Sequence, residues 1–180
     1  MKTESGQIQV YTGDGKGKTT AALGLAMRAI GNGLKVGMIF FDKGGAYYGE
    51  RKILDDLKKD GLQYQVFGLP RMTAGKGFRF KNEPGDLAEA QKALALAKKW
   101  IKSDLSLLIL DEVNTTIKTG LLKLENVLEL IGLKPEKLEL VLTGRYAPPE
   151  IIELADLVTE MKPLKHYINK GLGARPGIEY

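Results

Sequence analysis

A glycine-rich stretch near the N-terminus, residues 12–20 with the sequence TGDGKGKTT, constrains the fold of this chain more than any other feature. It follows an apolar segment, residues 8–11, and overlaps a run in which apolar residues recur at helical spacing, residues 19–30. Glycines allow the backbone to turn tightly and to direct its N–H groups at an anion, and the start of a helix adds positive potential. The stretch therefore predicts a strand, a phosphate-binding loop and a helix in succession.

The residues of this loop are predicted to bind the phosphates of a nucleotide: Gly13, Asp14, Gly15, Lys16, Gly17, Lys18, Thr19 and Thr20. Lys18 supplies a positive charge to a triphosphate, and the Thr19 hydroxyl is placed to bind Mg²⁺. The usual pattern, G-x-x-x-x-G-K-[ST], would put a glycine where this chain has Thr12, and the nearest glycine is Gly13. The spacing is therefore displaced. An ordinary turn between strand and helix is the alternative, but the glycines and the G-K-T ending disfavour it.

The composition limits the class of protein. The chain has 180 residues, no cysteine and a formal net charge of +5. This length fits one domain over residues 1–180, and the lack of cysteine excludes disulfides and fits a cytoplasmic location. No apolar run approaches the roughly 20 residues of a membrane span, and residues 1–7 do not resemble a signal peptide. Basic and acidic residues are interleaved, so we expect a small anionic ligand rather than a nucleic-acid or membrane partner.

Apolar runs and helical periodicities alternate along the rest of the chain. Strands are expected at residues 36–41, 64–67, 107–110, 138–142 and 157–161. Helices are expected at residues 51–59, 86–102, 123–131 and 148–155. Asp86 is expected to cap the second of these helices. The alternation predicts an α/β fold, a single P-loop (RecA-like) domain with a mostly parallel β-sheet and helices on both faces.

Polar clusters follow several of the predicted strands. They lie at residues 13–20, 42–45, 111–112 and 143–145. Because ligands of parallel sheets bind at the carboxyl ends of the strands, we expect these clusters to form one active site.

Asp111 and Glu112 end a buried strand in a Walker-B pattern, in which a carboxylate reaches Mg²⁺ directly or through water. Thr19 and Glu112 are the predicted metal ligands. Arg145 follows a later strand and is predicted to bind phosphate, with an ordinary surface arginine as the alternative. Lys43 has a similar position and the same alternative. His166, the one histidine, is expected to have a surface or structural role.

Residues 68–84 form a longer connection than is usual, and we interpret it as a functional loop. It contains the triplet Phe78-Arg79-Phe80. The two phenylalanines either pack beneath the loop or offer an apolar surface to a large flat ligand or to stacked bases.

Taken together, these motifs resemble one family, the P-loop cob(I)yrinic acid a,c-diamide or cob(I)alamin adenosyltransferases. The resemblance extends over nearly the whole chain, through residues 12–22, 28–33, 42–44, 75–80, 110–112, 142–145, 155–161, 165–166 and 177–179. It implies transfer of the 5′-deoxyadenosyl group of ATP to the Co(I) of a corrinoid, with release of triphosphate, in adenosylcobalamin biosynthesis or salvage. It also implies that ATP lies reversed relative to ordinary P-loop enzymes, in keeping with the displaced glycine.

The resemblance assigns roles to particular residues. Co(I) is itself a strong nucleophile, so no general base is implied, and Lys18 and Glu112 would stabilise charge on the leaving triphosphate. Phe78 and Phe80 match the positions that press against the lower face of the corrinoid, which is either cobalamin or cobyrinic acid a,c-diamide. The family also implies Mg²⁺ or Mn²⁺, a homodimer and a flavoprotein reductase as partner.

This sequence departs from the family pattern in three places. Phe80 stands where tryptophan is common. Only about a dozen residues precede the glycine loop, whereas longer members of the family carry an N-terminal arm. Arg175-Pro176 replaces the usual residues before the final Gly-Ile-Glu. Two other functions remain open from the residues alone. One is an ATPase or kinase that cleaves at the γ-phosphate, and the other is a RecA-like nucleic-acid-binding ATPase that uses the basic loop 71–81.

Overall fold

The computed structural model describes residues 5–73 and 77–180 and contains a six-stranded sheet in the order β3-β2-β6-β7-β1-β8. Its strands are β1 (Ile8–Thr12), β2 (Val36–Phe40), β3 (Leu62–Val66), β6 (Leu107–Asp111), β7 (Glu139–Thr143) and β8 (Leu157–Glu160). Every neighbouring pair in this sheet is parallel. The expected parallel α/β fold is confirmed.

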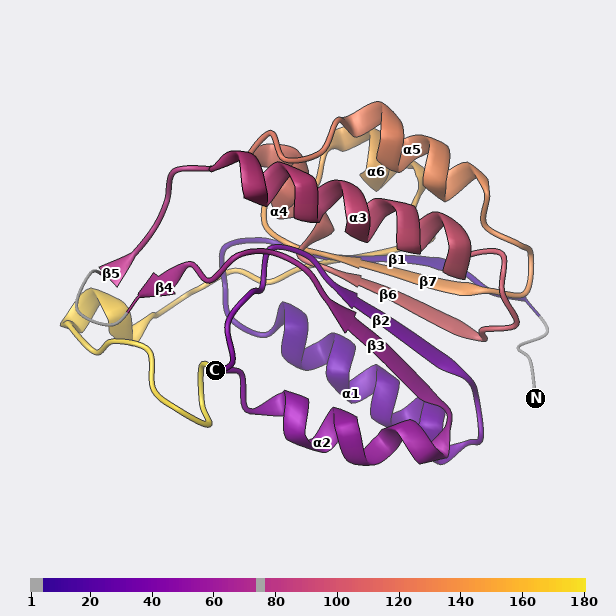
Figure 1. Ribbon diagram of the computed structural model, residues 1–180, viewed down its shortest axis with the longest axis horizontal. Coiled ribbons are helices and arrows are strands. Elements are labelled where there is room, and N and C mark those ends of the chain that lie inside the picture. The colour runs from indigo at the N-terminus through magenta and orange to yellow at the C-terminus, as the bar shows by residue number, and fades with distance from the viewer. Residues whose placement is uncertain (1–4, 74–76) are drawn as a thin grey trace.

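Helices cover both faces of the sheet, as expected (Figure 1). One face carries α1 (Lys18–Gly31) and α2 (Glu50–Asp56), and a 3₁₀ turn, η1 (Leu57–Asp60), extends α2. The other face carries α3 (Pro84–Trp100), α4 (Val113–Lys118), α5 (Leu124–Gly132) and α6 (Pro149–Leu154). None of the helices in the described ranges is both long and apolar enough to cross a membrane.

The side chains of β2 explain its near-continuous apolar sequence. Neighbouring residues of a strand point to opposite faces of a sheet. Met38 and Phe40 belong to the hydrophobic cluster that includes α1, whereas Ile39 and the following Phe41 belong to the cluster that includes α3 and α5. Both faces of this strand are therefore buried, which is typical of parallel sheets.

Two local expectations are corrected by the structure. The cap of α3 is Glu83, and Asp86 is instead the third residue of the helix, whose carboxylate accepts a hydrogen bond from the Glu83 N–H at 2.8 Å. This reciprocal arrangement is a capping box. The sequence does not predict helix α4, because its six residues are too few to show a helical period and include four polar side chains.

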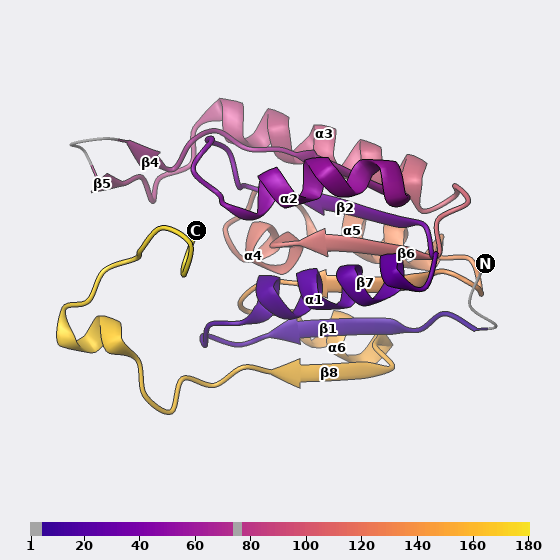
Figure 2. The ribbon, with the colours of Figure 1, turned by 90° about the horizontal axis from the view of Figure 1, so that it is seen from below.

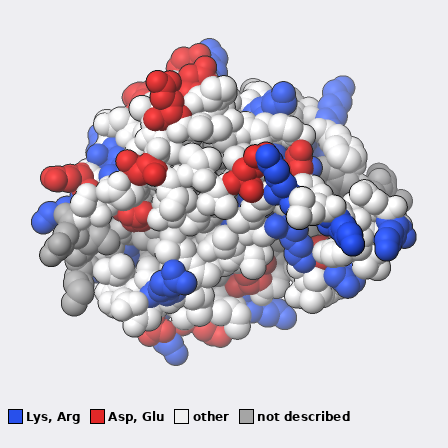
Figure 3. All heavy atoms as spheres, turned by 180° about the vertical axis from the view of Figure 1, so that it is seen from behind, with Lys and Arg blue, Asp and Glu red and all other residues white. Residues whose placement is uncertain are grey.

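The carboxyl ends of the six strands meet at one edge of the sheet (Figure 2). A short antiparallel pair, β4 (Met72–Thr73) and β5 (Gly77–Phe78), extends from that edge. The segment after β8, which contains the 3₁₀ turn η2 (Tyr167–Lys170), also runs along it and returns the C-terminus toward the strand ends. On the face behind that of Figure 1, basic and acidic side chains are interspersed, and basic ones are more numerous toward one end (Figure 3).

Candidate active site

The glycine loop between β1 and α1 is shaped by close contact with the chain that follows β8. The Gly15 N–H donates a hydrogen bond to the Met161 carbonyl at 2.7 Å. A Cβ on Gly13 or on Gly15 would lie 2.5 or 2.6 Å from that carbonyl oxygen, and Gly13 and Gly17 have positive φ angles of 94° and 124°. Gly13 therefore needs glycine for both space and backbone conformation, Gly15 for space and Gly17 for backbone conformation.

Lys18 begins α1, and its ammonium group lies within the loop. Its Nζ donates hydrogen bonds to the carbonyl oxygens of Gly13 at 2.7 Å and of Gly15 at 2.8 Å. Burial lowers the pKa of this ammonium, and the nearby Glu112 carboxylate opposes that shift. The loop thus concentrates a desolvated positive charge at the N-terminus of a helix, where an anion is favoured.

Asp111, Thr19 and Lys43 form a compact polar group at the strand ends. Lys43 Nζ donates to Asp111 Oδ2 at 2.6 Å and to Thr19 Oγ1 at 2.8 Å, and Thr19 Oγ1 itself lies 3.3 Å from Asp111 Oδ2. The other carboxylate oxygen of Asp111 accepts from Thr143 Oγ1 at 2.7 Å. Burial disfavours the charge on Lys43, but the carboxylates of Asp111 and Glu112 outweigh it, so the pKa of Lys43 is raised. Lys43 is therefore a charged member of the site and not an isolated surface lysine.

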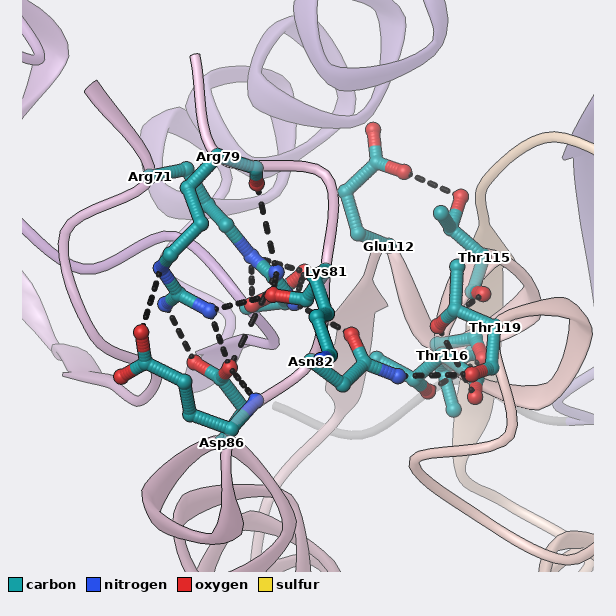
Figure 4. A network of polar contacts seen from close by, with 12 residues as sticks. Arg71, Arg79, Lys81, Asn82, Asp86, Glu112, Thr115, Thr116 and Thr119 are labelled. Carbon is teal, nitrogen blue, oxygen red and sulfur yellow. Dashed lines mark hydrogen bonds and ion pairs between the residues drawn. The ribbon is translucent and has the colours of Figure 1, made fainter. Parts of the chain in front are cut away.

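Glu112 adopts a left-handed conformation, with φ at 65°, at the junction of β6 and α4. Its N–H donates to Thr143 Oγ1 at 2.9 Å, and its carboxylate accepts a hydrogen bond from Thr115 Oγ1 (Figure 4). The backbone N–H of Arg145 also donates to Thr115 Oγ1, at 3.0 Å. The carboxylate in hydrogen-bond contact with Thr19 is thus that of Asp111, and the assignment of Thr19 and Glu112 as metal ligands stays a prediction.

A cavity of about 320 Å³ lies over the loop. It brings together most of the predicted site, namely Asp14, Gly15, Lys16, Gly17, Lys18, Thr19, Thr20, Glu112 and Arg145. Gly13 does not line it. Four residues that the sequence motifs do not assign to a site also line this cavity: Tyr48, His166, Ile178 and Glu179. A second cavity of about 300 Å³ shares Thr19, Lys43, Tyr48 and Glu179 with the first.

The C-terminal segment is held to the glycine loop through Glu179. Its carboxylate accepts hydrogen bonds from Lys16 Nζ at 2.9 Å, from the Tyr167 hydroxyl and from the Arg175 guanidinium at 3.2 Å. These donors hold the pKa of Glu179 well below its usual range, and the hydrogen bond from Arg175 has the largest effect. His166 accepts a hydrogen bond from the Ile168 N–H at 3.2 Å and caps η2, which is a structural role, although its side chain also faces the cavity.

The two phenylalanines lie outside both cavities. Phe78 and Phe80 are 50% and 86% exposed, and their ring centroids are 4.8 Å apart. They do not pack beneath the loop, so the first of the two sequence-based alternatives is wrong. Arg79, between them, points the other way and donates to Asp86 at 2.6 and 2.9 Å. Residues 74–76 of this loop, including Gly75 of the resembling element, lie outside the described part of the chain.

The oxygen donors present suit a hard cation. No group of three or more histidine, cysteine, aspartate or glutamate side chains is placed to bind a metal ion within residues 5–73 and 77–180. However, Thr19 Oγ1 and Asp111 Oδ2 both contact one cation, the Lys43 ammonium. Hydroxyl and carboxylate oxygens of this kind, supplemented by phosphate oxygens, are the ligands that Mg²⁺ uses in nucleotide sites.

A parallel α/β sheet with a glycine loop, a helix-terminal lysine and an acidic residue ending a nearby strand defines a P-loop nucleotide-binding protein. The model of the family described as ATP:corrinoid adenosyltransferase BtuR/CobO/CobP matches residues 4–180, and this chain belongs to that family.

Curated relatives agree over nearly the whole chain. The corrinoid adenosyltransferase of Escherichia coli (strain K12) is 38% identical over 178 residues, which cover 98% of this chain and 87% of that protein. That of Pseudomonas aeruginosa is 37% identical over 182 residues, 99% of this chain and 86% of the relative. The corrinoid adenosyltransferase CobA of Salmonella typhimurium is 36% identical over 178 residues, with 98% and 87% covered. The resemblance is confirmed, and the enzyme transfers the adenosyl group of ATP to a corrinoid.

Proposed function

We propose that the cavity over the glycine loop binds the triphosphate of ATP and that the exposed face of Phe78 and Phe80 binds the corrinoid. The observation that supports this division most directly is the composition of the two surfaces. The cavity is lined by Lys16, Lys18 and Arg145 together with the loop backbone, which suits an anion. The paired rings at the β4–β5 hairpin are apolar, exposed and close to each other, which suits a large flat ligand.

In the proposed reaction, the electron pair of Co(I) forms the Co–C bond at C5′ of ATP. The C5′–O bond breaks, and its electrons leave with the triphosphate. The protein therefore needs no proton acceptor at the reacting carbon. Its residues orient C5′ toward cobalt and stabilise the charge that develops on the triphosphate, tasks that we assign to Lys18, the loop N–H groups and Arg145.

We also propose that Thr19 and Glu112 hold Mg²⁺ or Mn²⁺, with Asp111 as an additional oxygen donor. The bound metal would neutralise part of the charge on the leaving triphosphate. The support for Thr19 and Asp111 is their shared contact with the Lys43 ammonium, because that contact places two oxygen donors around one positive charge. Glu112 lines the same cavity as Thr19.

Three further parts of the proposal concern the cellular setting. We propose a single-domain enzyme that acts in the cytoplasm, as a homodimer, on corrinoid that a flavoprotein reductase has reduced. The absence of cysteine fits a reducing compartment. Strand β8 is an edge strand whose Leu157 and Val158 are exposed, and such an edge is suited to contact with a second chain.

The activity is tested by incubating the protein with ATP, Mg²⁺ and chemically reduced cobalamin. We expect the light-sensitive spectrum of the adenosylated product to appear together with an equal amount of triphosphate. Formation of ADP and phosphate without a corrinoid-dependent triphosphate would show cleavage at the γ-phosphate instead.

The corrinoid surface is tested by Phe78→Ala, with Ile53→Ala on α2 as a control that also truncates an exposed apolar side chain. We expect Phe78→Ala to raise the KM for cobalamin, and to impair adenosylation from Co(II) with a reductase more than from pre-reduced Co(I). The reason is the implied contact with the lower face of the corrinoid. The assignment of Phe78 to that face is contradicted if both assays lose the same fraction of activity.

A further inference from the structure

Two arginine–aspartate pairs join the β4–β5 hairpin to the rest of the molecule. Arg71, which precedes β4 and is 5% exposed, donates to the Asp42 carboxylate through Nε at 2.9 and 3.1 Å and through Nη2 at 2.9 Å. Arg79 donates to both oxygens of Asp86. The first pair therefore ties the hairpin to the end of β2, and the second ties it to the start of α3. Figure 4 shows the two guanidinium groups side by side near Asp86.

Arg71 also holds the two sides of the hairpin together. Its Nη1 donates to the Lys81 carbonyl at 3.2 Å, and its Nη2 donates to Asn82 Oδ1 at 2.9 Å. The Arg79 N–H in turn donates to the Arg71 carbonyl at 2.8 Å. Asn82 continues the contact by donating to the Thr119 carbonyl at 2.8 Å, just beyond α4 (Figure 4). One buried guanidinium thus contacts segments on both sides of the exposed Phe78 and Phe80.

Asp42, the partner of Arg71, directly precedes a residue of the nucleotide site. It has a positive φ of 50°, which is uncommon for a residue with a side chain. Gly68 packs so closely that a Cβ there would lie 2.7 Å from Asp42 Cα, and the Lys43 N–H donates to the Phe67 carbonyl at 2.9 Å. Such a conformation persists where the surroundings determine it from several sides. The position of Asp42 is therefore coupled to that of Lys43.

We propose that Arg71 is a positioning residue that sets the corrinoid-binding hairpin at the correct place relative to the ATP-binding cavity, through Asp42 and Lys43. The inference rests on the proposed function, since it takes Phe78 and Phe80 as the corrinoid surface. Its physical basis is the planar guanidinium, which binds a carboxylate through two parallel hydrogen bonds and so fixes orientation as well as distance. Direct attack of cobalt on C5′ makes the rate depend on that relative placement.

The test compares Arg71→Lys with Arg79→Lys. Both keep the positive charge and lose a bidentate contact in the same hairpin, but only the first affects Asp42. With pre-reduced cobalamin, we expect kcat of Arg71→Lys to fall by about 10- to 100-fold, because misplacement of the reacting atoms by about 1 Å has an effect of this size. The KM for ATP should change by less than about threefold, since the cavity residues are unaltered. Arg79→Lys should keep kcat within about threefold of the wild-type value.

Asp42→Asn is the second variant, because it keeps the shape of the side chain and weakens the same contact from the other side. It should lower kcat with little change in the KM for ATP, and its melting temperature serves as the measure of folding. The role of Arg71 is overturned if Arg71→Lys and Asp42→Asn keep kcat within about threefold of wild type, or if Arg79→Lys lowers kcat equally.

The failure of the proposed function gives a different result. If Phe78→Ala and Phe80→Ala both leave the KM for cobalamin unchanged, the hairpin is not the corrinoid surface and both proposals fail. If they raise that KM while Arg71→Lys keeps its kcat, only the positioning role of Arg71 fails.

Discussion

The Lys43–Asp111 contact is a buried ion pair at the centre of the site, with side chains that are 13% and 0% exposed. We expect Lys43→Met to lower the free energy of unfolding by about 3 kcal/mol, because removing one partner leaves the other charge buried. The loss should lie at the lower end of the usual range, since the Thr19 and Thr143 hydroxyls still donate to Asp111. Urea denaturation measures it. Lys98→Met, which breaks an exposed pair with Glu129, is the control and should cost less than about 1 kcal/mol. Equal losses in the two variants would contradict this view of Lys43.

The same lysine predicts a dependence of stability on pH. Although burial opposes its charge, the neighbouring carboxylates raise the pKa of Lys43 in the folded state above the ordinary 10.5. A raised pKa means that the pair stabilises the fold fully below pH 10.5 and loses this effect as the pH rises through the folded-state pKa. We therefore expect the difference in unfolding free energy between the wild type and Lys43→Met to shrink above that pH. A constant difference in denaturation experiments up to pH 11.5, about one unit higher, would rule out this linkage.

Site residues could be predicted from the sequence where neighbouring positions form a pattern. The glycine loop, Glu112 and Arg145 each follow a strand or precede a helix, and they do line one cavity. The cap of α3 lies three positions before the predicted Asp86, because a capping box depends on which carboxylate the backbone N–H reaches. Tyr48 and Glu179 reach the cavity by tertiary packing; the family resemblance includes residues 177–179, but it did not assign Glu179 to the site.

The strand–loop–helix element from β1 to α1 depends on glycine in a position-specific way. Gly13→Ala places a side chain at a φ of 94° and 2.5 Å from the Met161 carbonyl, so we expect a loss of about 2 kcal/mol or more in stability. Gly24→Ala in the middle of α1 meets no atom within 4 Å. It should stabilise the protein by about 0.5–1 kcal/mol, because alanine is favoured over glycine within helices. Thermal unfolding distinguishes the two.

We expect the same two variants to differ in ATP binding as they do in stability. Gly13→Ala disturbs the loop N–H groups and is expected to abolish the rise in melting temperature that ATP produces, whereas Gly24→Ala should retain it. If Gly13→Ala kept the full ATP-dependent shift, the loop would not be the triphosphate site.

Among the elements, those with a strong hydrophobic pattern were predictable. The strands β2, β6 and β7 are buried on both faces, and their apolar runs indicate them directly. Helix α4 and the β4–β5 pair were not indicated, because two to six residues are too few for a period to appear. The described ends of the hairpin are held by the Arg71–Asp42 and Arg79–Asp86 contacts, which join residues 29 and 7 positions apart.

At the scale of the whole molecule, the strand order is a property that the chain sequence does not display. Strand β7 lies between β1 and β6, and this order places the glycine loop and Asp111 on either side of Thr143. The polar clusters predicted to form one site lie together at the carboxyl edge because all six strands of the sheet are parallel, which puts every strand end on the same side. The path of residues 162–180 was not predictable, since that segment has no period and folds back over the cavity through hydrogen bonds to Glu179.

The C-terminal segment is attached to the molecule mainly by polar contacts, and this predicts its behaviour. Neither hydrophobic cluster includes a residue beyond Ala155, whereas Glu179 accepts hydrogen bonds from Lys16, Tyr167 and Arg175. We expect Glu179→Gln to release the segment locally without unfolding the sheet. Trypsin should then cut after Lys165 or Lys170 roughly threefold faster or more, because cleavage follows the population of the open form. The melting temperature should change by less than about 2 °C.

Glu153→Gln, an exposed change on α6, is the control and should leave the cleavage rate unchanged. Mass spectrometry follows the cleavage. If both variants are cut at the wild-type rate, Glu179 does not hold the segment over the cavity. The position of the segment must then depend on the packing of Ile178 and Tyr180 near Tyr47 and Tyr48.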